Sequence, residues 1–168
     1  ISAAGDPFTE QVVPYGIDMV QARDVWDSNR DGVVDTGAPT GAGFTICIID
    51  SGINKDHVDL SGVNMLGGYP TGWDSDLFGH GTHVAGTIAA MNNSLGVVGV
   101  TPGTVSLYFI KVFGDDGAWS YSSTLMDAAN RCAAAGADII SMSLGGTRSN
   151  RQERITFDNL YAAGILSV

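Results

Sequence analysis

The chain of 168 residues is 44% hydrophobic and 15% charged, which is enough core-forming material for one globular domain and excludes a disordered chain. Its 18 acidic and 8 basic residues give a net charge of −10, which argues against nucleic acid or an anionic membrane surface as a partner. No apolar run approaches the roughly 18 residues that a membrane span needs.

The N-terminal part predicts an irregular arm followed by a turn and a short helix within residues 12–26. The apolar residues expected on one face of this helix are Ile17, Val20 and either Val25 or Trp26.

A loop with oxygen-bearing side chains at alternate positions comes next. It matches the first, third, fifth, seventh and ninth positions of an EF-hand-type calcium loop, the seventh through its carbonyl, with the residues Asp27, Asn29, Asp31, Val33 and Asp35. Gly32 stands at the turn, but Ala38 occupies the twelfth position, where an EF-hand has Glu. A polar surface turn is the simpler interpretation. Four matched side-chain positions and the glycine favour an EF-hand-like calcium site.

A buried strand and a helix then place an acid and a histidine at their ends. Residues 44–49 are nearly all apolar, as in a strand of a parallel sheet, and Asp50 follows at the carboxyl end, where open α/β sheets hold their sites. His80 precedes the small apolar residues 84–91, which predict a buried helix. A histidine at such a position suits proton transfer, and a carboxylate would fix its tautomer.

The remaining pattern alternates strands with helices. Strands are expected at 105–113, at 138–146 and at the end of the chain, a helix at 124–135, and an irregular glycine-rich loop at 61–77. Such alternation predicts an α/β fold with a parallel sheet covered on both sides. Cys47 in the first strand and Cys132 in the helix are either a disulfide or two buried thiols, and spacing does not decide between them.

Four sequence blocks together resemble the subtilisin-like serine proteases: IIDSGI around Asp50, GHGTHVAGT around His80, then KVFGDDG and SMSLGG. The likeness runs from about Gln11 to the last residue. It implies a three-layer α/β/α fold with a central parallel sheet, and a triad in which Asp50 orients His80, which takes the proton of a nucleophilic serine. A metal site of Asp50, His80 and His83 fits less well, because zincin histidines are four residues apart.

The resemblance also implies substrate and calcium sites. A peptide would lie as an added strand between two segments, with contacts to Gly117, Ala118, Trp119, Tyr121, Ser143, Leu144 and Gly145. Trp119 stands where relatives commonly have a small residue, so it would narrow an outer subsite or give it a new wall. Packing of Trp119 in the core is the alternative interpretation. A second calcium site would use the side chains of Gln11, Asp59 and Asn93 and the carbonyls of Met91, Leu95 and Val97.

The family's nucleophile and oxyanion-hole motifs do not occur in these residues. We therefore expect residues 1–168 to be the N-terminal portion of one catalytic domain, mature at Ile1, with its sheet incomplete at the C-terminal end. Alone, the chain should be nearly inactive. The complete protein is expected to be a secreted endopeptidase that acts on polypeptides. The remaining chain would carry the serine, and a propeptide or protein inhibitor would be a further partner. The alternative is a calcium-dependent peptide-binding module or pseudoprotease.

Overall fold

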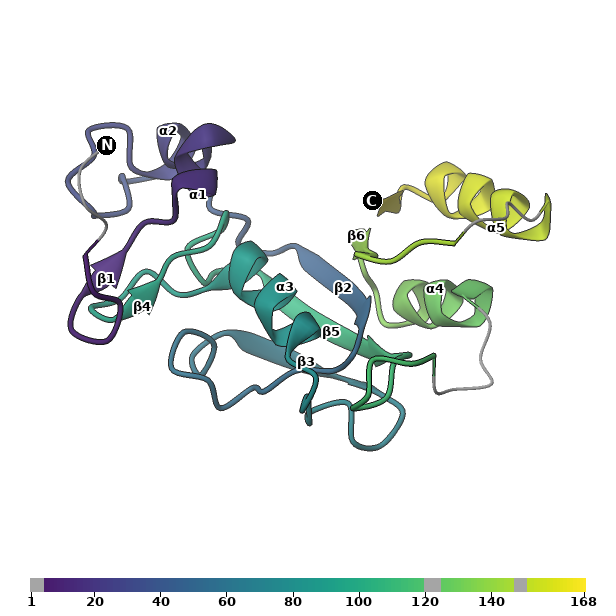
Figure 1. Ribbon diagram of the computed structural model, residues 1–168. Coiled ribbons are helices and arrows are strands. Elements are labelled where there is room, and N and C mark those ends of the chain that lie inside the picture. The colour runs from purple at the N-terminus through teal and green to yellow at the C-terminus, as the bar shows by residue number, and fades with distance from the viewer. Residues whose placement is uncertain (1–4, 120–124, 147–150) are drawn as a thin grey trace. The chain divides into compact units, whose positions relative to one another are not determined.

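The computed structural model describes residues 5–119, 125–146 and 151–168 (Figure 1). Its elements in chain order are β1 (Gln11–Val12), α1 (Tyr15–Met19), α2 (Ala22–Trp26), β2 (Thr45–Asp50), β3 (Asn64–Tyr69), α3 (His80–Ala89), β4 (Gly96–Val97), β5 (Ser106–Lys111), α4 (Leu125–Ala134), β6 (Ile139–Ser141), α5 (Arg151–Ala162) and β7 (Leu166–Ser167). Two compact units share them. The first comprises Ile1–Gly43, Lys55–Asn64 and His83–Val105, and the second comprises Phe44–Asn54, Met65–Thr82 and Ser106–Val168.

The second unit is built on a sheet with the strand order β3-β5-β2-β6-β7. Strand β2 pairs in parallel with β5 and with β6, and β6 pairs in parallel with β7. The strands predicted at 44–49 and at 105–113 are therefore present and parallel. Of the strand predicted at 138–146, only Ile139–Ser141 forms a strand, which is parallel to β2. Strand β2 thus lies between β5 and β6, and its last residue, Asp50, is paired with Lys111 of β5.

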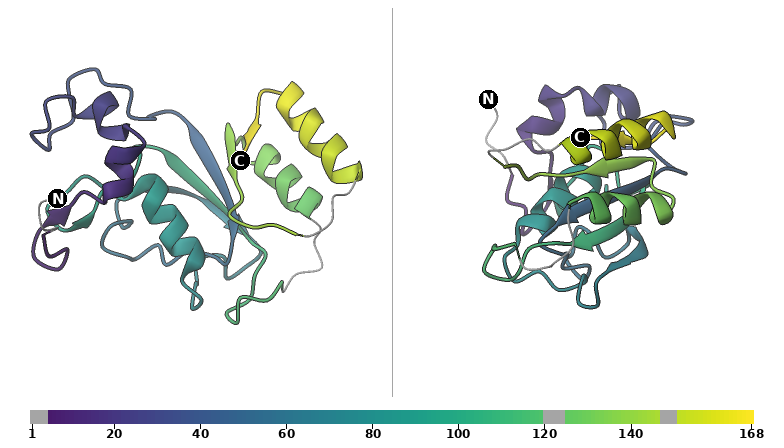
Figure 2. Two further views of the ribbon diagram at one scale, coloured as in Figure 1. Left: turned by 45° about the horizontal axis from the view of Figure 1, so that its top comes forward. Right: turned by 90° about the vertical axis from the view of Figure 1, so that its right-hand side faces the viewer.

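Helices α4 and α5 lie side by side in the second unit, as all views show (Figures 1 and 2). Helix α4 packs against β2 and β5, and α5 contacts β7. The core beneath them combines aliphatic strand residues with small helix residues, which lets the helix backbone approach the sheet closely. Its buried members are Cys47, Ile49, Ile110, Val112, Ala128, Ala129, Cys132, Ala137, Ile140 and Leu160.

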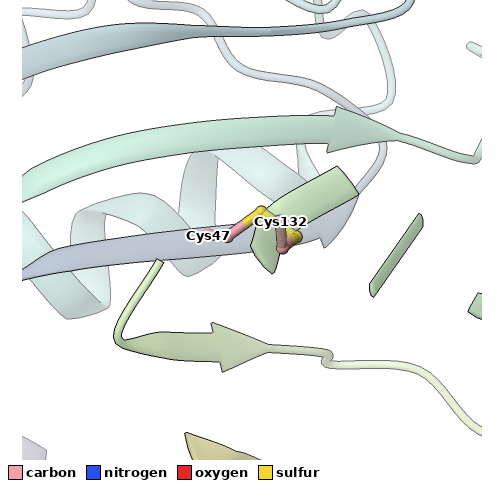
Figure 3. The surroundings of a disulfide bond; sticks show 2 residues. All are labelled: Cys47 and Cys132. Atoms are coloured by element: carbon pink, nitrogen blue, oxygen red, sulfur yellow. A yellow bond between two sulfur atoms is a disulfide. The ribbon is translucent and has the colours of Figure 1, made fainter. Parts of the chain in front are cut away.

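A disulfide joins Cys47 of β2 to Cys132 of α4 (Figure 3). Both cysteines are fully buried, and their Cα atoms are 5.5 Å apart. The structure thus selects the disulfide from the two alternatives that the sequence left open. The bond ties the central strand to the helix that covers it.

The first unit contains the short parallel pair of β1 and β4, together with α1 and α2. The predicted single helix is broken at Gln21, whose φ is 60°. As a result, Ile17 and Trp26 are buried, whereas Val20 and Val25 are exposed. The expected apolar face was therefore right for Ile17 and for Trp26, the second of the two alternatives, and wrong for Val20.

Two further expectations need correction. The glycine-rich segment 61–77 contains strand β3, whereas the sequence predicted only loop. Helix α3 is not buried all round, since Ala85 and Ala89 are buried but His83 and Thr87 are exposed.

Within the described residues, no helix is long and apolar enough to cross a membrane.

Candidate active site

Asp50 ends β2 as a fully buried carboxylate at the carboxyl edge of the sheet. Its Oδ1 accepts a hydrogen bond of 2.7 Å from the backbone N–H of Ser51. Its Oδ2 is buried and has no hydrogen-bond partner in the described part of the chain. A buried carboxylate is costly unless it is paired, so its position must be fixed by a neighbouring donor or cation.

His80 supplies that partner from the first turn of α3. Its Nδ1 lies 2.7 Å from Oδ1 of Asp50, while 46% of the His80 side chain remains exposed. Because the carboxylate can only accept, Nδ1 carries the proton and Nε2 is left as the basic nitrogen. The arrangement can therefore remove a proton from a group presented on the open side of the ring.

The close approach of α3 to β2 depends on small residues. A Cβ at Gly81 would lie 2.1 Å from the carbonyl oxygen of Gly52 and 3.2 Å from Cβ of Asp50. Gly52 itself has a φ of 106°, which side-chain-bearing residues rarely adopt. The glycines in the two sequence blocks thus let the acid and the histidine meet.

A second carboxylate, Asp76, lies in the loop before α3. Burial raises its pKa, but hydrogen bonds from the hydroxyl and N–H of Thr82, the N–H of Gly79 and the hydroxyl of Ser51 outweigh burial and lower the pKa below its usual value. Asp76 is therefore ionised at neutral pH. Sequence reasoning did not single it out.

A pocket of about 200 Å³ opens beside the histidine. Its lining residues are Asp50, Phe78, His80, Phe113, Gly117, Ser143, Leu144 and Gly145. Four of the seven residues predicted to contact substrate therefore border one pocket with the acid and the histidine. The aromatic walls are additions that sequence reasoning missed. Phe78 could have been noticed as an apolar residue in a polar loop two positions before His80.

The other three predicted substrate residues are placed differently. Ala118 is exposed, and its carbonyl accepts a hydrogen bond from the N–H of Gly114. Trp119 is 44% exposed, and its ring meets the ring of Phe113 edge-on at 5.3 Å. Trp119 thus adds aromatic surface behind Phe113, while Tyr121 lies outside the described residues.

The predicted calcium residues around Gln11 come together in the first unit. Nε2 of Gln11 lies 2.7 Å from the carbonyl oxygen of Met91, 3.4 Å from Oδ1 of Asn93 and 3.5 Å from the carbonyl oxygen of Val97. Asp59 is buried, and its Oδ1 accepts a hydrogen bond from the N–H of Val97. Several oxygens thus converge on one amide nitrogen, and this donor set suits a hard cation such as calcium. Leu95 is exposed nearby, and its N–H bonds Oδ1 of Asn93.

The loop at residues 27–35 has most of its oxygens engaged within the chain. Asp27 is fully buried and pairs with Arg23 at 2.5 Å. Oδ2 of Asp35 accepts two hydrogen bonds from Ser28, which lower the pKa of Asp35.

Two further hydrogen bonds lie within this loop. Nδ2 of Asn29 donates to Asp31, and Oδ1 of Asp31 accepts the N–H of Val33. The described residues contain no group of three or more His, Cys, Asp or Glu residues that could hold a metal ion.

The other histidines do not join the pair. His83 is exposed on α3. His57 is exposed in the first unit, where its Nδ1 accepts the N–H of Asp59. A metal site of Asp50, His80 and His83 thus gains no support from the geometry.

Comparisons with known proteins agree with this geometry. A model of the Peptidase_S8 family, described as the subtilase family, matches residues 41–168. Subtilisin DY of Bacillus licheniformis is 40% identical over 161 residues, which cover 94% of this chain and 54% of that protein. Alkaline elastase YaB of Bacillus sp. (strain YaB) is 39% identical over 166 residues, which cover 95% of this chain and 39% of that protein.

A solved structure shares the fold. The psychrophilic subtilisin-like protease Apa1 from the Antarctic psychrotroph Pseudoalteromonas sp. AS-11 matches with a TM-score of 0.79 and 38% identity, over 93% of this chain and 35% of that chain. This match confirms the predicted three-layer α/β/α class with a central parallel sheet. The chain spans about half the length of the first of these relatives and a smaller share of the others.

Proposed function

The chain belongs to the subtilase family, and we propose that it is the N-terminal portion of the catalytic domain of a secreted serine endopeptidase. The observation that carries the proposal is the 2.7 Å contact between Nδ1 of His80 and the buried Oδ1 of Asp50. The rest of the protein would supply the nucleophilic serine and the oxyanion-hole donor. The length of the relatives supports this division, since the 161 matched residues cover only 54% of subtilisin DY.

In this mechanism the two residues of the pair have different tasks. Asp50 holds the imidazole in the tautomer that leaves Nε2 free, and it stabilises the imidazolium that forms. Nε2 of His80 takes the proton of the serine hydroxyl as the serine attacks the peptide carbonyl, and later gives it to the leaving amine. His80 lines the pocket and its side chain is 46% exposed, so a polypeptide that enters the pocket can reach the imidazole.

The pocket supports a polypeptide substrate with an apolar side chain next to the bond that is cut. Phe78, Phe113 and Leu144 provide apolar walls, and Gly117 and Gly145 border the pocket without side chains, so a strand-like peptide could approach their backbone. Ala118, Trp119 and Tyr121 would extend this contact along the peptide. A propeptide or protein inhibitor would dock in the same way.

A fluorophosphonate probe applied to the complete protein tests the function. The probe should label one serine, and Asp50→Asn should reduce kcat/KM for a peptide substrate by about 10⁴-fold because the imidazole would lose its tautomer. Asp158→Asn, an exposed carboxylate on α5, is the matched control and should leave the rate unchanged. Calcium-dependent peptide binding without labelling or hydrolysis would instead identify a binding module or pseudoprotease.

We also propose calcium at the Gln11 cluster. If the Gln11 amide is turned over, its oxygen joins those of Met91, Asn93 and Val97, and a cation takes the place that the amide nitrogen holds. Asp59 contributes the charge, and the carbonyl of Leu95 completes the set. Calcium would act here by stabilising the fold rather than by taking part in peptide hydrolysis.

Calcium at residues 27–35 is a separate proposal. The spacing of Asp27, Asn29, Asp31, Val33 and Asp35 supports it, but a cation would have to compete with Arg23 for Asp27.

Terbium luminescence tests this loop in the complete protein, because the buried Trp26 precedes Asp27 and can sensitise a nearby lanthanide. Asp31→Asn should abolish this signal, while Gln11→Ala should retain it. Emission that neither substitution changes would exclude the loop as the site.

Secretion is supported by the Cys47–Cys132 disulfide, because such bonds persist in oxidising compartments. Fractionation of the producing cells, followed by an activity assay of the medium, tests this location. Recovery of the active protein only from the cytoplasm would contradict it.

A further inference from the structure

Asp76 accepts four hydrogen bonds from groups around the start of α3. Its Oδ1 accepts the hydroxyl of Ser51 and the N–H of Gly79, both at 2.9 Å. Its Oδ2 accepts the N–H of Thr82 at 2.8 Å and the hydroxyl of Thr82 at 2.6 Å. Four acceptor sites are all that an ionised carboxylate has, so Asp76 is fully engaged.

Both hydroxyls that bind Asp76 also accept a bond from the backbone. Oγ of Ser51 accepts the N–H of Gly81 at 2.9 Å, and Oγ1 of Thr82 accepts the N–H of Asn54 at 2.9 Å. Ser51 follows Asp50 at the end of β2, whereas Gly81 follows His80 on α3. The carboxylate is therefore linked on one side to the strand end and on the other to the first turn of the helix.

The loop that carries Asp76 is itself anchored to the strand ends. Nζ of Lys111, at the end of β5, donates to the carbonyl oxygen of Ser75 at 2.7 Å. The N–H of Ile53 donates to the carbonyl oxygen of Trp73 at 3.0 Å. A Cβ at Gly52 would lie 2.4 Å from the oxygen of Ser75, so the two segments are in close backbone contact. Asp76 thus acts from a fixed position.

We propose that Asp76 is a positioning residue that holds the first turn of α3, and with it the imidazole of His80, in hydrogen-bond contact with Asp50. The N–H groups on both sides of His80, those of Gly79 and Gly81, are held by Asp76 directly or through Ser51. These groups have no acceptor within the helix, so without the carboxylate they would turn toward water. The catalytic consequence rests on the proposed endopeptidase function, whereas the structural consequence does not.

Asp76→Asn in the complete protein tests the role. Asparagine keeps the shape of the side chain, but it replaces one carboxylate oxygen with an NH₂ group, which donates and cannot accept. Depending on the orientation of the amide, this NH₂ group faces either the two donors of Thr82 or the donors of Ser51 and Gly79. Since displacement of about 1 Å costs on the order of 100-fold in rate, we expect kcat to fall at least tenfold with a smaller change in KM. The downfield proton resonance of the His80–Asp50 hydrogen bond should weaken or disappear in the NMR spectrum.

Three milder variants keep the test decisive if Asp76→Asn does not fold. Thr82→Val removes one of the four bonds and should weaken the same resonance partially, whereas Thr82→Ser retains the hydroxyl and should resemble the wild type. Asp76→Glu should restore part of the loss because it keeps a carboxylate.

The outcomes separate this inference from the proposed function. A folded Asp76→Asn protein with an unchanged His80–Asp50 resonance overturns the positioning role, whatever its activity. If Asp76→Asn does not fold, a Thr82→Val protein whose His80–Asp50 resonance equals that of Thr82→Ser overturns the role as well. A wild-type protein that shows the resonance but no peptidase activity, together with loss of the resonance in the variant, contradicts the endopeptidase and supports the role of Asp76.

Discussion

Removal of the Cys47–Cys132 disulfide should destabilise the protein more than the loss of one methyl group from the same core. The bond closes a sequence separation of 85 residues. In the chain-entropy description, cross-linking a loop of that length lowers the conformational entropy of the unfolded chain enough to add about 4.6 kcal/mol at 25 °C. Because native disulfides typically contribute 2–5 kcal/mol, we expect Cys47→Ala with Cys132→Ala to lose about 4 kcal/mol.

The assay is equilibrium unfolding of the complete protein in guanidinium chloride, with the oxidised wild type as reference. Ile140→Val is the matched control, since Ile140 is fully buried in the same core and the substitution removes one methyl group without cutting a cross-link. It should cost about 0.5–1.5 kcal/mol. The loss of stability in the double variant should therefore exceed that of the control by roughly 2.5–3.5 kcal/mol.

Two results would refute this reasoning. A double variant that unfolds at the same denaturant concentration as Ile140→Val would show that the bond adds no more than its packing. Two free thiols at Cys47 and Cys132 in the native protein, found by peptide mapping without reduction, would remove the premise.

Three further predictions concern the site and the calcium cluster. Gly81→Ala should abolish most activity and destabilise the protein, because its Cβ would lie 2.1 Å from a backbone oxygen. Gly86→Ala on the same helix should instead stabilise the protein by up to about 1 kcal/mol, since its Cβ meets no described atom within 4 Å. Activity and thermal unfolding of both variants check this. Asp76 has a lowered pKa in the folded protein. The stability that the ionised carboxylate contributes is therefore complete above the unfolded pKa of about 3.9 and is lost as pH falls through the folded pKa. The difference in stability between the wild type and Asp76→Asn should close below about pH 4, and a constant difference in acid unfolding curves would contradict this. Chelation of calcium should lower the unfolding temperature of the wild type but have a smaller effect on Gln11→Ala, and equal shifts in a calorimetric scan would exclude the Gln11 cluster.

The acid–histidine pair could be predicted because both residues lie at the ends of regular elements. A nearly continuous apolar run ends in Asp50, a run of small apolar residues begins after His80, and parallel strands bring their carboxyl ends to one edge of the sheet. The three parallel strands and α4 followed from the same patterns. Local pattern and tertiary structure agree at these positions.

The features that sequence reasoning missed depend on contacts between distant segments. Strand β3 carries two glycines and alternates between exposed and half-buried residues, so its pairing with β5 rather than its own sequence makes it a strand. The separation of Val20 and Val25 from the buried face depends on the backbone conformation of Gln21. Phe78 joins the pocket only because Gly117 leaves room for its ring, since a Cβ there would lie 2.6 Å from that ring.

The geometry of the site also explains why its glycines matter as much as its ionisable groups. An imidazole can reach a buried carboxylate only if the helix that carries it approaches the strand end at backbone distance, and Gly52 and Gly81 provide that approach. At such a distance, neither segment has room for a side chain that could hold the other in place. The hydrogen bonds must therefore come from residues beside the contact, and Ser51, Thr82 and Asp76 occupy those positions. On this reasoning, the placement of His80 should be sensitive to Asp76 even though the carboxylate makes no hydrogen bond to the imidazole itself.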